Sequence, residues 1–221
     1  MEIGIIGAGH IGGTLTRLLS AQGHTIKVAN SRAPETLAEL AMETGATAVW
    51  AQDAAADAEL VILSIPQKNV VDLAAGIVQT AKPGAPVIET NNYYPQERDG
   101  RIAAIEQGMP ESVWVSEQLG VPVFKVFNGI FWKHLLEDGR PHGAAGRIAL
   151  PVAGDDPANK RIVFDLVDAL GFDPVDGGTL AESWRQQPGT PVYGSDLDSE
   201  AAIRALSEAS PERTDAFRAE P

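Results

Sequence analysis

The sequence contains no cysteine, which excludes disulfide bonds, thiolate zinc sites and thiol nucleophiles. Long hydrophobic runs are also missing: the longest, residues 60–65 and 148–153, fall far short of the roughly 20 residues that a membrane-spanning helix needs. The first residues enter a strand pattern directly, without the basic head and small-residue cleavage site of a secretion signal. We therefore expect a soluble cytoplasmic protein.

Positive charge is scarce, because 17 lysines and arginines face 30 aspartates and glutamates, for a net charge of −13. Long-range repulsion by such a protein argues against nucleic acid or an anionic membrane as a partner. The four histidines, at positions 10, 24, 134 and 142, have none of the short spacings of a zinc site. No Gly-x-Ser-x-Gly elbow occurs either. These absences leave a small molecule as the expected partner, with no bound metal.

Short β-branched runs alternate with helical patterns along most of the chain, which predicts parallel strands joined by helices. Residues 60–65 are apolar throughout, as expected for a strand covered on both faces at the sheet centre. We predict an α/β fold: a doubly wound, mostly parallel Rossmann sheet over residues 1–185, with a C-terminal α/β extension. Residues 186–221 are expected to be helical and to pack on the domain or on a partner subunit. Strands are expected at 2–6, 25–29, 46–50, 60–65, 86–90, 122–127, 147–153 and 172–175, and helices at 10–22, 34–44, 69–80, 110–119 and 156–170.

The run Gly7-Ala8-Gly9-His10-Ile11-Gly12 fits G-x-G-x-x-G and lies between the first strand and the first helix. Gly7 permits a tight turn, Gly9 lets backbone N–H groups approach a pyrophosphate, and Gly12 lets the helix pack closely on the strand. The helix N-terminus adds partial positive charge. His10 either contacts the cofactor or caps the helix start. Because both flanks are correct, the motif predicts dinucleotide binding.

The end of the second strand distinguishes the two dinucleotides. An acidic residue there selects NAD by binding the ribose 2′-hydroxyl, but this sequence reads Ala29-Asn30-Ser31-Arg32. A guanidinium can hold a 2′-phosphate in a bidentate contact, whereas a carboxylate repels it. We therefore predict NADP(H), with Asn30, Ser31 and Arg32 around the phosphate. The alternative is an ordinary Asn-Ser turn beside a surface arginine.

Ligands of open parallel sheets bind outside the carboxyl ends of the strands. The residues that follow the expected central strands should therefore line the nicotinamide end, although Asn, Pro and Gly also serve simply as turn residues. Asn and Ser side chains can bond the carboxamide, and the Ile-Pro pair can brace the ring. The residues so assigned are Ser64, Ile65, Pro66, Asn91, Asn92 and Asn128. A long polar loop over residues 91–109 is also expected to be functional.

The sequence shows no convincing Lys–Glu or His–Asp pair of the kind that shuttles protons in alcohol dehydrogenases. Hydride transfer between two bound redox rings needs positioning more than acid–base chemistry. The absence of such a pair favours cofactor-to-cofactor transfer, and no catalytic residue is assigned.

Several segments together resemble the NADPH-dependent deazaflavin (coenzyme F420) reductase family of the 6-phosphogluconate dehydrogenase-like Rossmann superfamily, over roughly residues 1–185. The chain is also similar to the cytosolic NADPH-binding domain of six-transmembrane metalloreductases. The resemblance implies that residues 9–12 hold the pyrophosphate, Ser31 and Arg32 the 2′-phosphate, and Ile65-Pro66 the nicotinamide side. It further implies a homodimer, and a second redox cofactor that lies over the nicotinamide in a cleft covered by the C-terminal part of the chain. The segments are residues 7–12, Asn30-Ser31-Arg32, Ser64-Ile65-Pro66, and residues 125–128, 150–156 and 170–178.

The resemblance ends near residue 180, since residues 181–191 and the acidic tail depart from the pattern of deazaflavin reductases. A deazaflavin, a flavin, a quinone or a small carbonyl compound is therefore compatible as the hydride acceptor. Our leading hypothesis is an NADP(H)-dependent oxidoreductase that passes hydride to a flat deazaflavin or flavin. One alternative is a non-enzymatic NADP(H) sensor or interaction module. Another is a carbonyl or imine reductase with a proton path through Tyr93, Tyr94 or Lys125.

Overall fold

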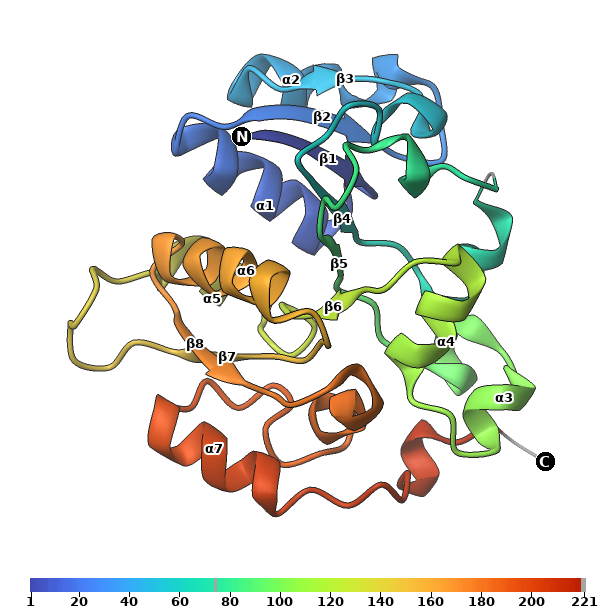
Figure 1. Cartoon of the computed structure of the whole chain (residues 1–221), viewed down its shortest axis with the longest axis vertical. Helices are drawn as coiled ribbons and strands as arrows, with labels where there is room; N and C mark the ends of the chain where they lie inside the picture. Colours follow the sequence, from blue (N-terminus) through green and yellow to red (C-terminus); the bar gives the residue numbers. More distant parts are fainter. Residues whose placement is uncertain (74, 220–221) are drawn as a thin grey trace.

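The computed structural model describes residues 1–73 and 75–219. Its main sheet contains six strands, all parallel, in the order β3–β2–β1–β4–β5–β6 (Figure 1). This order reverses direction between β1 and β4, as in the predicted Rossmann sheet, and the α/β fold is confirmed. The strands are β1 (Glu2–Ile6), β2 (Thr25–Ala29), β3 (Thr47–Ala48), β4 (Leu60–Leu63), β5 (Val87–Glu89) and β6 (Phe124–Lys125).

Strand β4 lies at the sheet centre, as predicted, and all four of its side chains are fully buried. Because successive strand residues point to opposite faces, they divide between two cores. Leu60 and Ile62 join the core covered by α1 (His10–Ala21), α5 (Trp132–Glu137) and α6 (Pro157–Ala169). Val61 and Leu63 join the core on the other face, beneath α3 (Ala103–Glu106) and α4 (Glu111–Leu119).

The predicted helix at 69–80 is wrong. The described residues form two 3₁₀ turns instead, Gln67–Asp72 and Val78–Thr80, and Ala74 lies outside the described residues. Gly76 has φ of +80°, which interrupts a right-handed helix, and the β-branched pair Val70-Val71 weakens helix formation further.

Other element boundaries also shift. The helix predicted at 34–44 begins as a 3₁₀ turn, Pro34–Leu37, and continues as α2 (Ala38–Thr44), which ends at left-handed Gly45 as expected. The strands predicted at 46–50 and 122–127 shorten to β3 and β6. Phe127, at φ of +63°, cannot continue an extended strand. The loop over 91–109 is mostly irregular, with one π turn (Pro95–Asp99) and α3.

A second, two-stranded parallel sheet pairs β7 (Ala149–Val152) with β8 (Asp173–Asp176). Helix α6 and helix α7 (Ser199–Ser207) lie on opposite sides of this pair (Figure 1). The carboxylate of Asp156 caps α6 by accepting the Asn159 N–H at 2.7 Å. An antiparallel bridge between Lys125 and Ala153 joins the small sheet to β6. The small sheet therefore extends the edge of the Rossmann sheet.

The predicted boundary at residue 185 stays a prediction, and contacts cross it at several points. Gln186 accepts from the Asn128 amide, the Gly194 N–H donates to the Gly129 carbonyl, and a C-terminal arginine reaches α4. Within the described part of the extension, only Ser199–Ser207 forms an α-helix. None of the described helices is both long and apolar enough to cross a bilayer.

Candidate cofactor and hydride-transfer site

The three glycines of the motif differ in what surrounds them. Gly7 has φ of +107°, its N–H donates to the Ala29 carbonyl at 2.8 Å, and a Cβ there would lie 2.0 Å from the Ser64 oxygen. A Cβ at Gly12 would lie 1.8 Å from the Gly7 carbonyl oxygen. A Cβ at Gly9 would meet nothing within 4 Å. The fold itself therefore requires Gly7 and Gly12, whereas Gly9 borders open space.

Gly9 is also the N-cap of α1, and no side chain caps that end. The first N–H groups of a helix have no partner within the helix, so an uncapped start offers donors to an anion. Ile11 is half-buried against the core. A groove of about 610 Å³ adjoins this helix start and contains Gly9, His10 and Thr36. These residues fit a pyrophosphate.

His10 stacks on the indole of Trp132, with ring centroids 5.0 Å apart and planes 11° from parallel. The two rings form part of the wall of the groove beside the glycine loop. The imidazole thus packs across the N-termini of α1 and α5 instead of capping α1.

The turn after β2 is held by Asn30. Its side-chain Oδ1 accepts the Arg32 N–H at 2.8 Å, and its side-chain Nδ2 donates to the Thr36 hydroxyl at 3.0 Å. The side chains of Ser31 and Arg32 are exposed. The side chain of Asn30 therefore stabilises the turn, as in the alternative of an ordinary Asn-Ser turn. The side chains of Ser31 and Arg32 remain accessible to a ligand.

The ends of β4 and β5 are joined directly. Thr90 donates its hydroxyl to that of Ser64 at 3.0 Å, and the side-chain Oδ1 of Asn91 accepts the Ile65 N–H at 3.2 Å. The Asn91 Nδ2 group is buried and has no hydrogen-bond partner among the described residues. A buried amide donor without a partner is rare in folded proteins and needs an explanation. A ligand carbonyl, such as a carboxamide oxygen, fits it, with Ile65 and Pro66 half-buried beside it.

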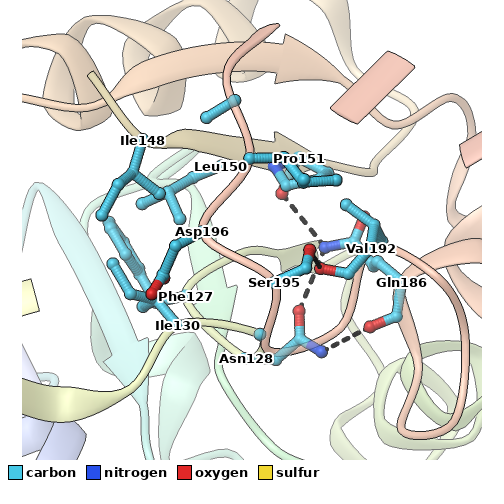
Figure 2. Close-up of a pocket in the computed structure, with 13 residues that line it drawn as sticks. Phe127, Asn128, Ile130, Ile148, Leu150, Pro151, Gln186, Val192, Ser195 and Asp196 are labelled. Atoms are coloured by element: carbon cyan, nitrogen blue, oxygen red, sulfur yellow. Dashed lines mark hydrogen bonds between the residues drawn. The ribbon is translucent and has the colours of Figure 1, made fainter. Parts of the chain in front are cut away.

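Asn92 and Asn128 bind each other: the Asn92 amide donates to the Asn128 backbone carbonyl at 2.8 Å, and the Asn128 amide donates to Asn92 Oδ1 at 3.1 Å. Figure 2 shows the Gln186 amide between Asn128 and the Pro151 carbonyl. The cavity drawn there is about 20 Å³, which is space for about one water molecule. Asn128 thus anchors the C-terminal extension to the end of β6.

The structure forms a buried Lys–Glu cluster that was not predicted from the sequence. Lys125 Nζ lies 3.2 Å from Glu89 Oε1 and 3.8 Å from Glu111 Oε2, and all three side chains are fully buried. Lys125 also donates to the Asn91 carbonyl at 2.9 Å, and the Asn91 N–H donates to Glu89 Oε2 at 2.8 Å. Ser112 donates its hydroxyl to Glu89. This buried network holds the backbone of Asn91 in place through both its N–H and its carbonyl group.

Arg213, from the C-terminal extension, completes the network. Its guanidinium donates to Glu111 Oε1 at 2.7 Å and to Gln187 Oε1 at 2.8 Å, and it lies 5.3 Å from the Tyr93 ring centroid. Burial raises the pKa of the Glu111 carboxyl, and the charges of Lys125 and Arg213 oppose this rise. Two carboxylates and two cations thus share one buried cluster.

Two His–Asp pairs also form that the sequence did not predict. His134 Nδ1 lies 2.5 Å from an Asp196 oxygen, and His142 Nδ1 lies 2.9 Å from Asp168. The His142 side chain is 83% exposed, and its hydrogen bond lowers the pKa of Asp168. His142 therefore pairs at the surface.

The chain's three tyrosines take different roles. Tyr93 is fully buried, and its hydroxyl accepts the Ile102 N–H at 3.0 Å. Tyr94 and Tyr193 are only partly buried, and their hydroxyls hydrogen-bond each other. The Arg98 guanidinium lies 5.2 Å from the Tyr94 ring centroid and donates to the Asn92 carbonyl at 2.6 Å. Tyr93 is thus a structural residue, whereas Tyr94 and Tyr193 are accessible to a ligand.

Sequence reasoning missed Glu89, Glu111, Tyr193 and Arg213. A signal existed for one pair: a glutamate and a lysine end two strands that were both predicted and are neighbours in the sheet, with Glu89 in register with Lys125. No sequence signal places Arg213 beside Glu111, 102 positions earlier.

Comparisons with known proteins identify relatives of the N-terminal part of the chain. The family model described as "NADP oxidoreductase coenzyme F420-dependent" matches residues 2–93, from the glycine motif to the Asn91-Asn92 turn. A 66-residue segment, 30% of the chain, is 51% identical to the protein YjhV of Escherichia coli K12, and the match spans about half (48%) of that relative.

Two solved structures extend the likeness to most of the chain. The hypothetical protein SMa0349 of Sinorhizobium meliloti is 32% identical, with a TM-score of 0.73, covering 89% of this chain and 94% of that one. A candidate F420-dependent NADP reductase from Arthrobacter sp. FB24 shares the fold at 22% identity and a TM-score of 0.64, covering 81% and 86% of the two chains. Over residues 2–93, which contain the glycine loop, the chain belongs to the family described as coenzyme F420-dependent NADP oxidoreductases, and its likeness to the S. meliloti protein extends over 89% of the chain.

Proposed function

We propose that the protein binds NADPH and passes its hydride to a flat redox acceptor, a deazaflavin or a flavin. One observation carries the proposal. Along the carboxyl edge of the sheet, the accessible Arg32, the open space at Gly9 and the unpartnered amide of Asn91 follow in the order β2, β1 and β5. Each matches a different part of NADPH: the 2′-phosphate, the pyrophosphate and the carboxamide.

The residues would divide the work as follows. The N–H groups at the start of α1 bind the pyrophosphate, and Ser31 and Arg32 bind the 2′-phosphate. Ile65 and Pro66 contact one side of the nicotinamide, while Asn91 Nδ2 donates to its carboxamide. When bound, the nicotinamide supplies a hydride. The buried Lys125–Glu89 network holds Asn91 in place without reaching the surface.

The deazaflavin or flavin acceptor rests on the family match. A second acceptor class, a small carbonyl compound or imine, is favoured by the hydroxyl pair of Tyr94 and Tyr193. Reduction of a neutral C=O or C=N bond requires a proton as well as a hydride, and a positioned hydroxyl can supply it.

Two measurements test the proposal. Titration calorimetry should show tighter binding of NADPH than of NADH. Stopped-flow absorbance at the NADPH band should then show oxidation by at least one acceptor from a panel of deazaflavins, flavins, quinones, ketones and cyclic imines. Tight NADPH binding without oxidation by any acceptor would instead support a cofactor sensor. Equal affinity for NADPH and NADH would reject the 2′-phosphate site.

A further inference from the structure

The hydroxyls of Tyr94 and Tyr193 meet beside Asn92, at the carboxyl end of β5. Tyr193 Oη lies 3.4 Å from Asn92 Nδ2 and hydrogen-bonds the Tyr94 hydroxyl. The neighbouring Asn91 provides the unpartnered amide of the proposed nicotinamide end. The hydroxyl pair thus contacts the residue that follows Asn91 in the chain, at the same carboxyl end of β5.

Tyr193 is held in place although it follows the main domain in sequence. The Gly194 N–H donates to the Gly129 carbonyl at 2.9 Å, and a Cβ at Gly129 would already lie 3.8 Å from the Tyr193 backbone and ring. The Ser195 hydroxyl donates to the Val192 carbonyl at 2.8 Å. The end of β6 and this turn thus position the phenol over the sheet edge.

The surroundings keep both phenols protonated. Burial raises the pKa of Tyr94, and burial together with the Tyr94 hydrogen bond raises the pKa of Tyr193. The charge of the Arg98 guanidinium opposes the rise in pKa of both tyrosines, and it can stabilise a transient phenolate. Such a pair can donate a proton and be reprotonated through its neighbour.

We propose that Tyr193, backed by Tyr94, donates the proton in the reduction of a small carbonyl compound or neutral imine by NADPH. This inference rests on the proposed NADPH site. The hydride adds to the carbon of the C=O or C=N bond, and the π electron pair moves to the oxygen or nitrogen. That atom takes the proton of Tyr193, which is restored from Tyr94 and then from solvent. The balance is acceptor plus NADPH plus H⁺ to reduced acceptor plus NADP⁺.

The test compares the three conservative variants Tyr193→Phe, Tyr94→Phe and Tyr93→Phe. Tyr93 is the matched control, because its hydroxyl is fully buried against the Ile102 N–H. With a neutral ketone or imine, Tyr193→Phe should lower kcat about 100-fold or more, the usual range for general acid catalysis. Tyr94→Phe should lower kcat less, and Tyr93→Phe should keep kcat near the wild-type value. The Kd for NADPH should be unchanged in all three.

A preformed iminium salt provides the second arm, because hydride transfer to it requires no proton. Tyr193→Phe should reduce the iminium at the wild-type rate while failing with the neutral acceptor. If Tyr193→Phe slows the reduction of both acceptors equally, or slows neither, the assignment of Tyr193 as the proton donor is overturned.

The two proposals fail in different ways. If the wild type binds NADPH and reduces a deazaflavin or flavin but no ketone or imine, the role of Tyr193 is overturned and the proposed function stands. If NADPH does not bind, both are overturned.

Discussion

Lys125 Nζ and Glu89 Oε1 lie 3.2 Å apart in the core, although 36 positions separate the two residues. Both side chains are fully buried, and both also bind the backbone of Asn91. An ion pair inside the sheet therefore fixes a residue at its ligand-facing edge, so that packing in the core and geometry of the site are coupled.

Lys125→Met should lower the free energy of unfolding by about 3–5 kcal/mol, because it leaves buried carboxylates without their cation. Lys82→Met is the matched control, since Lys82 pairs with Glu59 at 3.1 Å but both side chains are 40–50% exposed. The control should cost less than about 1 kcal/mol. Urea unfolding followed by circular dichroism measures both. Similar losses in the two variants would contradict a role for burial.

Gly12→Ala and Gly9→Ala should separate folding from cofactor binding. A methyl at position 12 overlaps the Gly7 carbonyl oxygen, so Gly12→Ala should destabilise the fold by about 2 kcal/mol or more. Gly9→Ala meets open space and should cost less than about 1 kcal/mol, yet weaken NADPH binding by crowding the pyrophosphate. Thermal melts and calorimetry check the two effects. A Gly9→Ala protein with wild-type NADPH affinity would remove the pyrophosphate from this turn.

Arg32→Ala should weaken NADPH binding by about 2 kcal/mol, roughly 30-fold in Kd, and barely change NADH binding, because only NADPH carries the 2′-phosphate. Arg161→Ala provides the control, since that arginine forms an exposed pair with Asp165 within α6. It should leave both affinities unchanged. Calorimetric titrations with the two cofactors measure the difference, and equal losses for both in Arg32→Ala would reject the phosphate contact.

Burial raises the pKa of Tyr93 from 10.0 to about 12. The folded state thus binds this proton more tightly than the unfolded chain, so the contribution of Tyr93 to stability is complete below pH 10 and disappears as pH approaches 12. Two pKa units correspond to about 3 kcal/mol. The unfolding free energy of the wild type should fall by this amount relative to Tyr93→Phe across that range. Parallel pH profiles in urea unfolding would show that Tyr93 does not titrate this way.

Much of this fold follows from local pattern. The placement of the glycine motif between β1 and α1 and the buried run of β4 are each set by residues close in sequence, and the structure confirms both. The helix prediction for residues 69–80 was wrong because apolar spacing alone does not reveal that Gly76 has a positive φ. The convergence of Ile65 and Asn91 follows once the strands are known to be parallel neighbours.

The contact of Glu111 with Arg213 and the tyrosine pair were beyond prediction for a different reason. Glu111 and Arg213 are brought together by the path of the C-terminal extension across α4, and Tyr94 meets Tyr193 in the same way. Such contacts depend on how irregular segments cross the domain, and no periodicity encodes that path.

The pairing of Glu111 with Arg213 has a consequence for biosynthesis. On the ribosome Glu111 is made 102 positions before Arg213, one of its two cations, and a buried carboxylate that lacks part of its neutralising charge is costly. The segment around α4 should therefore stay incompletely folded in the nascent polypeptide, and accessible to chaperones and proteases, until Arg213 has left the ribosome and can pair with Glu111.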